Sequence, residues 1–436
     1  MPVPASWRID LDNYVPLAVG TVELRSELAP QCDAIRDRAN SDSRPQRARV
    51  LLRIDGQPIG YATAPLSDAG ELIASVRDQA LAALSLHLGR AAESLSALID
   101  TMPPAVLRPE RGRGTVTIAI PTRNRANSLQ RLLDSIDKLN YRDFTVLVVD
   151  NAPTTDSTYL MVRERMQANS QLRYEVEPRR GGSHARNCAL RAISSDFVLF
   201  ADDDTVLDRL TLDGMLDGFE RDDKIGCVTG FVASWELDTL AKARFDQLSA
   251  WGTRFVPRVR SLDPDSDVGP AYPYTAGVFG AGAVYAFRCE ALKEIGVFDL
   301  ALGPGTPAHG AEDMDMFVRT ILSRWSIAYE PSMVAWHDNR PTDEDLRRQI
   351  WGWGVGLSSY VTKLLTSSDS RTDVWRRIPA GIRHTRTLNQ RDRAARLPAG
   401  VIATQLMAWT YGPIGYARSR FGVRREANQQ SRKSES

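Results

Sequence analysis

The chain has 436 residues, enough for more than one domain, and its 43% hydrophobic and 25% charged residues are ordinary values for a soluble globular protein. The net charge is +1, but from Arg371 onward 14 Lys and Arg face 4 Asp and Glu, whereas the rest of the chain carries 41 against 50. This asymmetry predicts a basic C-terminal region that meets an anionic surface, either a membrane or a nucleic acid. Four widely spaced cysteines and an N-terminus without a basic, apolar leader argue against a secreted disulfide framework and predict a reduced, cytoplasmic protein.

The first 110 residues predict a small α+β module. Two strands, Val50–Ile54 and Ile59–Ala62, flank Asp55-Gly56, a pair that favours a tight hairpin turn. The segment ELIASVRDQALAALSLHL then has the apolar spacing of a helix, and residues 100–114 have the Pro, Gly and charge content of a linker. No reactive constellation is recognisable in residues 1–110, so the sequence leaves the role of this module open.

From Thr115 onward apolar strands alternate with amphipathic helices. The expected order is strand VTIAI, helix NSLQRLLDSIDKL, strand FTVLVVD, helix TYLMVRERMQ, strand LRYEVE, helix SHARNCALRAI and strand DFVLF. This alternation predicts an α/β domain over residues 113–345, with a parallel sheet covered by helices on both faces. Ligands bind such sheets at the carboxyl ends of the strands, so the polar residues that follow each strand are the site candidates.

Three consecutive carboxylates, Asp202, Asp203 and Asp204, follow one of these strands after a single Ala. Adjacent like charges repel one another, so the cluster predicts a cation among them, and hard ions such as Mg²⁺ and Mn²⁺ prefer oxygen ligands. The alternative is a solvated turn in which one Asp caps the next helix. The sequence shows no structural counter-ion for the cluster, which favours the metal.

Three other segments bring polar groups to the same expected edge. The loop PTRNR, residues Pro121–Arg125, offers donors and cations to a nucleotide or phosphate, or is simply a turn with a helix cap. Asp150 ends the second strand, where it can bind a base or ribose, or start a turn. In RRGGSHARNCAL two glycines allow close backbone approach to a ligand and Arg186 can grip a phosphate, although a tight turn before an amphipathic helix is the alternative.

The segment GPGTPAHGAEDMDMFVRTI places Glu312, Asp313 and Asp315 in the first turn of a helix. Acids are electrostatically favoured there, but the Gly- and Pro-rich loop before them is typical of a mobile lid. A carboxylate behind such a lid can accept a proton from an attacking hydroxyl. His337, at the end of the strand in YEPSMVAWHDNR, is either a hydrogen-bonded structural residue or a ligand of a metal held by the acidic triplet.

The chain resembles the family 2 glycosyltransferases of the GT-A fold in five segments that occur in the family's order. These are VTIAIPTRNR, VLVVDNAPTTDST, RRGGSHARNCALRAISSDFVLFADDD, GAGAVYAFRCEALKEIGVFDLALGPGTPAHGAEDMDMFVR and WH. The resemblance covers roughly residues 115–340, over half the chain. It implies a Rossmann-like, mainly parallel sheet with helices on both faces, and an inverting enzyme that depends on a nucleotide sugar.

The resemblance also implies roles for the residues that match the family's motifs. The acidic triplet stands at the Asp-x-Asp (DXD) motif, which implies diphosphate binding by Asp202 and Asp203 and metal coordination by Asp204. His337 matches a histidine that ligates the metal, Mg²⁺ or Mn²⁺, in some members. Donor contacts are implied for Pro121, Thr122, Arg123, Asp150, Arg186 and Asn187.

The implied reaction is metal-dependent transfer of a single, hexosyl-type sugar from a UDP-, GDP- or dTDP-sugar to a hydroxyl group, with inversion. The metal would stabilise the departing diphosphate, and Asp313, with Glu312 as the alternative base, would deprotonate the acceptor. A glycan or a lipid-linked sugar is the expected acceptor, in polysaccharide, glycolipid or other cell-envelope glycan synthesis. The family's processive synthases carry Gln-x-x-Arg-Trp and spanning helices, whereas this chain has RRQIWGWG and no good spanning segment, which favours single transfer.

Two other classes of protein remain as alternatives. A GT-A-like nucleotidyltransferase also uses an α/β sheet, a metal and acids, but usually has a Gly-rich loop that PTRNRANS lacks. A non-catalytic sugar- or nucleotide-binding scaffold is expected to have lost the acids, and every expected acid is present.

Residues 346–436 predict a helical, basic C-terminal region. Ile402, Leu406 and Trp409 share one face of a helix that Pro398 and Pro413 would limit to about ten residues, too short to cross a bilayer. The preceding arginines, which give this stretch the composition of an interfacial helix, are Arg376, Arg377, Arg383, Arg386, Arg391, Arg393 and Arg396. The sequence therefore predicts a cytoplasmic protein that either contacts the inner face of the membrane through this helix or packs the helix on the catalytic domain. No recognised nucleic-acid-binding module is present, so no nucleic-acid partner is expected.

Overall fold

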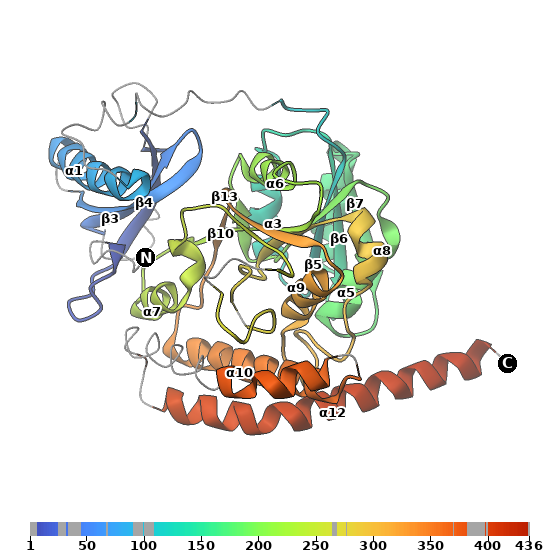
Figure 1. Cartoon of the computed structure of the whole chain (residues 1–436). Coiled ribbons are helices and arrows are strands. Elements are labelled where there is room, and N and C mark those ends of the chain that lie inside the picture. Colours follow the sequence, from blue (N-terminus) through green and yellow to red (C-terminus); the bar gives the residue numbers. More distant parts are fainter. Residues whose placement is uncertain are drawn as a thin grey trace.

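The computed structural model of the chain (Figure 1) describes residues 7–24, 32–33, 45–66, 69–89, 99, 109–263, 268–275, 277–368, 370–381, 397 and 400–434. Within these residues the strands form two sheets, one near the N-terminus and a larger one that carries the predicted site. Most of the predicted linker, and Arg383, Arg386, Arg391, Arg393 and Arg396 of the predicted basic stretch, lie outside the described residues.

The N-terminal sheet has the order β2-β1-β3-β4 and carries one helix, α1, on its outer side (Figure 1). Its elements are β1 (Leu17–Glu23), β2 (Cys32–Asp33), β3 (Arg47–Ile54), β4 (Gln57–Pro65) and α1 (Ala69–Leu88). The hairpin predicted at Asp55-Gly56 is confirmed: β3 and β4 are antiparallel, and the turn residues have φ of 53° and 79°. Two positive φ values are what a two-residue hairpin turn of type I′ requires.

The larger sheet follows the predicted alternation of strands and helices. Its order among the described residues is β11-β13-β10-β12-β8-β5-β6-β7, with β9 paired to β13. The strands are β5 (Val116–Thr122), β6 (Phe144–Asn151), β7 (Leu172–Glu177), β8 (Phe197–Ala201), β9 (Thr205–Leu207), β10 (Ile225–Ser234), β11 (Arg258–Arg260), β12 (Val284–Arg288) and β13 (Ser326–His337). β7, β6, β5 and β8 are mutually parallel, as are β10 and β13, whereas β12 runs antiparallel between the two groups.

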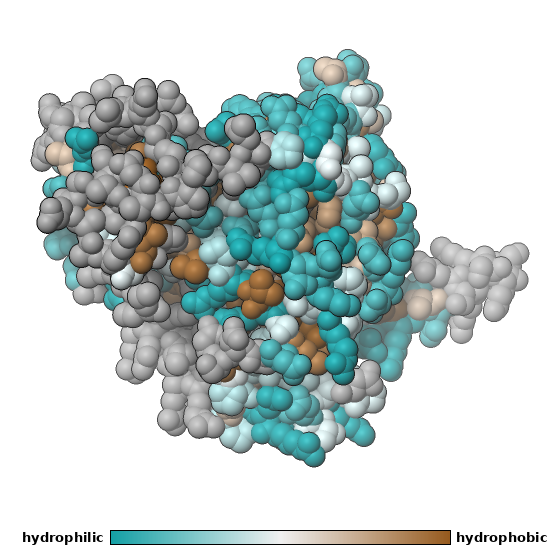
Figure 2. All heavy atoms as spheres, turned by 45° about the horizontal axis from the view of Figure 1, so that its top comes forward, coloured by the Kyte–Doolittle hydropathy of each residue, from teal (hydrophilic) through white to brown (hydrophobic). Residues whose placement is uncertain are grey.

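Helices cover both faces of this sheet, as predicted (Figure 1). One face packs against α3 (Ala126–Ile136), α4 (Ser157–Ala168) and α6 (Thr211–Phe219). The other packs against α5 (Gly182–Ala192), α8 (Cys289–Ile295) and α9 (Glu312–Leu322). Alternate strand residues enter the two cores, since Ile118 and Leu199 lie in the first and Ala119 and Phe200 in the second, which is the period of two that a β-strand imposes. The residues coloured in Figure 2 are mostly hydrophilic, with apolar side chains in small scattered groups.

The N-terminal sheet packs directly on the larger sheet. One continuous apolar cluster joins Trp7 and Tyr61 of the N-terminal part to Phe231 of β10, Phe255 and Trp336 of β13. The aromatic rings are in contact, with centroid distances of 4.9 Å for Trp7–Phe255 and 6.4 Å for Tyr61–Phe231. The two sheets therefore share buried apolar surface.

Two long helices, α10 (Asp343–Thr366) and α12 (Val401–Ser434), lie side by side below the sheet, and α12 projects beyond the body (Figure 1). The prediction that Pro413 ends the last helix is wrong, because α12 continues through it. A proline removes one backbone donor and disturbs the turn before it, but Ser358 and Ser359 of α10 donate hydrogen bonds to the Ala408 and Gly412 carbonyls at 3.1 and 3.0 Å. Among the described residues, no helix has both the length and the apolar content needed to cross a membrane.

Candidate active site

A cavity of about 840 Å³ opens at the carboxyl ends of the parallel strands. It brings together most of the site residues predicted from the sequence: Pro121, Thr122, Arg123, Arg186, Asp202, Asp203, Asp204, Glu312, Asp313 and His337. These residues come from segments separated by up to about 200 positions, and the sheet places them together because parallel strands end at a common edge.

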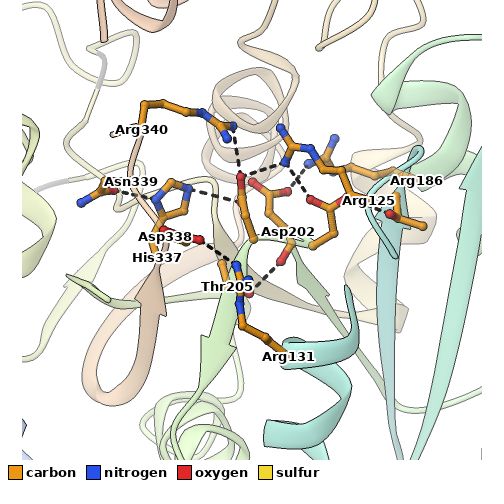
Figure 3. Close-up of polar contacts among 12 residues, drawn as sticks. Arg125, Arg131, Arg186, Asp202, Thr205, His337, Asp338, Asn339 and Arg340 are labelled. Atoms are coloured by element: carbon orange, nitrogen blue, oxygen red, sulfur yellow. Dashed lines mark hydrogen bonds and ion pairs between the residues drawn. The ribbon is translucent and has the colours of Figure 1, made fainter. Parts of the chain in front are cut away.

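The carboxylates of Asp203 and Asp204 are held by protein donors. Asp203 accepts hydrogen bonds from Thr122 Oγ1 at 2.7 Å and from Arg125 at 2.9 Å. Asp204 accepts from the same Arg125 guanidinium at 2.9 Å and from Arg340 at 3.1 Å. Figure 3 shows Arg125 and Arg340 approaching the acidic cluster from opposite sides. The premise that the triplet lacks a protein counter-ion is therefore wrong.

His337 forms a further cationic contact of the triplet. Its Nε2 lies 3.4 Å from Asp204 Oδ1, while its Nδ1 lies 2.7 Å from Asn339 Oδ1. Burial alone would lower the pKa of His337, but the Asp204 carboxylate outweighs burial and raises it to about 9. Burial would raise the pKa of Asp204, but His337, Arg125 and Arg340 together hold it well below its usual value.

Arg186 links the triplet to the predicted catalytic pair. Its guanidinium donates to Asp202 Oδ1 at 3.0 Å and to Glu312 Oε1 at 2.9 Å, and its side chain is 5% exposed. Glu312 is therefore a buried, ion-paired group, although burial still raises its pKa to about 7. Asp313, whose pKa burial also raises, is less buried, and its Oδ1 accepts a hydrogen bond from the backbone N–H of its neighbour Met314 at 2.8 Å.

Asp313 occupies space that a glycine leaves for it. A Cβ added at Gly282, in the loop before β12, would lie 2.7 Å from Asp313 Cγ and closer still to one carboxylate oxygen. The absence of a side chain at this position therefore permits the carboxylate to lie where it does.

Two predicted donor residues, Asp150 and Asn187, do not line the cavity. Asp150 is fully buried, with one carboxylate oxygen accepting from Tyr174 at 2.8 Å and the other without a hydrogen-bond partner among the described residues. Burial raises its pKa. Asn187 exchanges two hydrogen bonds with the Phe298 backbone, at 2.8 and 2.9 Å, so its amide holds a loop in place. The neighbouring Asn151 lines the cavity instead.

Other cavity residues were not predicted. Arg125 is the last residue of PTRNR and Arg340 the last residue of WHDNR. Their closeness in sequence to the candidate site residues could have indicated that they line the cavity. The cavity wall contributed by the C-terminal helices includes Trp353 of α10 and Trp409 of α12. In the sequence, the spacing of Trp351 and Trp353 favours core or interface aromatics slightly over a sugar-stacking platform, and the contact of these helices with the cavity depends on tertiary packing.

The donor set fits Mg²⁺ or Mn²⁺ held together with a nucleotide, and does not fit an ion held by the protein alone. Among the described residues no group of three or more His, Cys, Asp or Glu side chains is arranged to bind a metal. Asp204 and His337 would supply one oxygen and one nitrogen ligand, and the ion would replace the proton that His337 Nε2 shares with Asp204 while Nδ1 keeps its contact with Asn339. Such ions commonly take few protein ligands and complete their coordination with phosphate and water.

The fold and the cavity define an α/β protein whose candidate ligand site lies at the carboxyl ends of its parallel strands, among carboxylates and arginines. Residues 117–296 match the sequence profile of glycosyl transferase family 2. Over these residues the chain is similar to the family 2 glycosyltransferases.

Characterised proteins resemble the chain over about half its length. A pre-mycofactocin glycosyltransferase of Mycobacterium tuberculosis is 28% identical over 243 residues, which are 54% of this chain and 46% of that protein. A poly-β-1,6-N-acetyl-D-glucosamine synthase of Staphylococcus epidermidis is 23% identical over 238 residues, 53% and 52% of the two chains. A mannosyltransferase of Pyrobaculum calidifontis, solved with GDP-Man and Mn²⁺, is 19% identical and covers 72% of this chain and 77% of its own, with a TM-score of 0.45. The chain thus spans about half the length of the curated relatives it matches.

Proposed function

We propose that the protein transfers a single sugar from a nucleotide-diphosphate sugar to an acceptor hydroxyl, with inversion at the anomeric carbon. The observation that carries the proposal is that Asp313 shares one cavity with the acidic triplet Asp202–Asp204. A metal-binding and diphosphate-binding group and a separate base are the two components that direct displacement of a sugar requires. The names of the relatives, a pre-mycofactocin glycosyltransferase and a poly-β-1,6-N-acetyl-D-glucosamine synthase, support sugar transfer in glycan synthesis.

The donor half of the cavity is formed by the loop after β5 and by the triplet. Pro121, Thr122 and Arg123 line the part of the cavity that we assign to the nucleotide. Arg125 and Arg340 bind carboxylates of the triplet here and would turn to the diphosphate when the donor arrives, because phosphate oxygens are equally good partners for a guanidinium. Asp204 and His337 would hold Mg²⁺ or Mn²⁺, which when bound supplies charge stabilisation to the departing diphosphate.

We assign the base to Asp313 rather than to Glu312. Both residues line the cavity, but Glu312 forms an ion pair with Arg186 at 2.9 Å that occupies one of its carboxylate oxygens, whereas Asp313 is less buried. Asp313 takes the proton from the acceptor hydroxyl as its oxygen attacks the anomeric carbon. The bond from that carbon to the diphosphate oxygen breaks, its electron pair leaves with the nucleoside diphosphate, and one displacement inverts the configuration.

The acceptor half of the cavity is aromatic. Phe245 of α7 (Leu240–Leu248) lies between His337 and Trp353, with ring centroids 5.9 and 5.4 Å away. Trp353 and Trp409 both line the cavity and remain more than one-third exposed. Aromatic faces of this kind suit the apolar faces of sugar rings, which supports a glycan or a lipid-linked sugar as the acceptor.

The C-terminal helix supports peripheral contact with the inner face of the membrane. α12 packs on α10 through Ala408 and Gly412 but exposes Leu406, Ile414 and Phe421 on its outer surface. The sequence left two alternatives, packing of this helix on the catalytic domain or contact with the membrane. The helix has one face that packs on α10 and another that exposes apolar side chains, so it can do both. An apolar stripe near a cavity wall would bring the site close to a lipid-linked acceptor in cell-envelope glycan synthesis.

The direct test is a thermal-shift panel with UDP, GDP, dTDP and their sugars, each with and without Mn²⁺. A nucleotide that binds the folded state raises the melting temperature by mass action, and the shift should require Mn²⁺ in the wild type and be lost in Asp204→Ala. NMR of the product's anomeric signal, with the identified donor, then reports inversion. Equal nucleotide affinity in wild type and Asp204→Ala, unchanged by EDTA, would contradict the metal assignment.

A further inference from the structure

A line of buried polar contacts starts in the N-terminal module. Arg49 of β3 is 4% exposed, and its guanidinium stacks on Tyr61 with 4.1 Å from Cζ to the ring centroid. One guanidinium nitrogen lies 3.3 Å from Asp246 Oδ2 on α7, outside the module. The other oxygen of Asp246 accepts a hydrogen bond of 2.7 Å from Ser234 Oγ at the end of β10.

The same line continues to the active site. Asn339 Nδ2 donates to Ser234 Oγ at 2.7 Å, and Asn339 Oδ1 lies 2.7 Å from His337 Nδ1. His337 Nε2 lies 3.4 Å from Asp204 Oδ1. Figure 3 shows the last part of this line, with Asn339 directly beside the His337 ring.

The charge of Asp246 fixes the direction of every hydrogen bond in the line. An ionised carboxylate only accepts, so the Ser234 hydroxyl must donate to it and use a lone pair for the next partner. That lone pair can accept only from the Asn339 amino group, which turns the Asn339 carbonyl oxygen toward His337. A carbonyl oxygen only accepts, so Nδ1 of His337 must carry a proton, and Nε2 is the nitrogen presented to Asp204.

We infer that the N-terminal module is part of the catalytic unit, and that Arg49 is a positioning residue that fixes the orientation of the His337 ring through Asp246, Ser234 and Asn339. The inference rests on the proposed function, in which His337 Nε2 and Asp204 hold the metal. The inference gives a structural role in metal binding to the N-terminal module, residues 1–110, whose sequence shows no recognisable reactive group. Partners that hold the second nitrogen of a metal-binding histidine typically change metal affinity by about 10–100-fold when they are removed.

The same strand offers a matched control. Arg53 of β3 also crosses from the module to the larger sheet, where it lies 2.7 Å from Asp208, and its side chain is 8% exposed. Asp208 otherwise accepts from the backbone N–H of Leu210, so within the described part of the chain no side-chain contact leads from it to His337. Replacing Arg53 therefore removes a comparable buried ion pair between the two sheets without interrupting the line.

The experiment measures Mn²⁺ affinity by EPR in the presence of the nucleoside diphosphate, chosen from UDP, GDP and dTDP, that most stabilises the full-length protein. The variants are Ser234→Ala, Arg49→Met and Arg53→Met, with melting temperatures recorded for each. Ser234→Ala should weaken Mn²⁺ binding about tenfold. Arg49→Met should weaken it at least threefold, and Arg53→Met should leave it within twofold of wild type at a similar loss of thermal stability.

Each outcome decides the inference. Equal Mn²⁺ affinity in wild type and Ser234→Ala overturns it, whatever the behaviour of Arg49→Met. Should Arg49→Met fail to fold, Ser234→Ala still decides, because that variant keeps the ion pair between Arg49 and Asp246. Wild type that binds no Mn²⁺ with any of the three nucleotides contradicts the proposed function and the inference together, whereas normal wild-type binding with unaffected variants contradicts the inference alone.

Discussion

Gly282→Ala tests whether the position of Asp313 controls the reaction. The added Cβ would lie 2.7 Å from Asp313 Cγ and closer still to Oδ2, whereas ordinary contacts begin at 3.4 Å, so Cγ must move by about 0.7 Å and the carboxylate oxygen by more. A displacement of about 1 Å at a reacting group can cost 10²-fold, and a general base contributes about 10²–10⁴-fold, so kcat should fall by about 10- to 100-fold. Nucleotide affinity should stay near wild type, because the donor half of the cavity is unchanged. Turnover and nucleotide affinity are measured separately once the donor is known.

The matched control is Gly310→Ala, since Gly310 also lines the cavity but a Cβ there meets no atom within 4 Å. A second check combines Gly282→Ala with Asp313→Asn. If the alanine acts through the Asp313 carboxylate, the double variant should be no slower than Asp313→Asn alone, because two changes to one catalytic group are not additive. Turnover of Gly282→Ala within threefold of wild type, or fully additive losses in the double variant, would refute the reasoning.

Three further outcomes are expected. Asp313→Asn should lower transfer by about 10²–10⁴-fold with nearly intact donor binding, and a normal Asp313→Asn beside an inactive Glu312→Gln would exchange the two roles. Because burial raises the pKa of Asp313 and the base must be ionised, kcat/KM should fall on the acid side at a higher pH than an exposed aspartate would give; a profile that stays flat down to pH 5 contradicts this. The protein should sediment with anionic liposomes at low salt, and replacement of the exposed Leu406, Ile414 and Phe421 by Ser should abolish sedimentation at unchanged melting temperature.

The catalytic fold and the composition of the cavity were predictable because both depend on short-range patterns. Apolar runs such as that ending at Ala201 define buried strands, and the right-handed alternation of strands and helices leaves few arrangements of a parallel sheet. Polar residues directly after those strands, such as Thr122 and Asp202, must then lie at one edge. The antiparallel strand β12 has no such signature, since its direction depends on the path of a long connection.

The partners of the acids were less predictable than the acids themselves. Arg125 sits three residues beyond a strand end and Arg340 three beyond another, and their guanidinium groups reach Asp204 only because the two loops fold toward each other. Sequence reasoning took the triplet as a cluster without counter-ions and required an ion from outside. The side chains of this chain already balance that charge, so a metal must compete with two arginines for Asp204.

Local rules failed at Pro413 for a related reason. Helix propensity predicts an end there, but Gly412 packs so closely on Ser358 that α10 can supply hydrogen bonds to the carbonyls around the proline. These bonds reach the Ala408 and Gly412 carbonyls and not the Trp409 carbonyl, which is the one that loses its backbone donor at Pro413, so they fasten α12 to α10 on both sides of the proline. The long helix carries Trp409 to the cavity wall.

The N-terminal module shows why the role of a whole segment escaped sequence reasoning. Its strands carry no acid, base or nucleophile in a recognisable pattern, and a search for reactive groups therefore finds nothing. The contribution that we infer lies in Arg49, an arginine whose partner, Asp246, is almost 200 positions away and is not one of the residues that line the cavity. The pair is connected to His337 through the hydrogen bonds of Ser234 and Asn339. The direction of each bond follows from which atoms can donate and which can accept, and this can be worked out only when the positions of the side chains are known. The role of a buried arginine between two packed sheets is consequently not shown by its own contacts alone. It also depends on which side chain hydrogen-bonds the second carboxylate oxygen of the arginine's partner, as Ser234 does for Asp246.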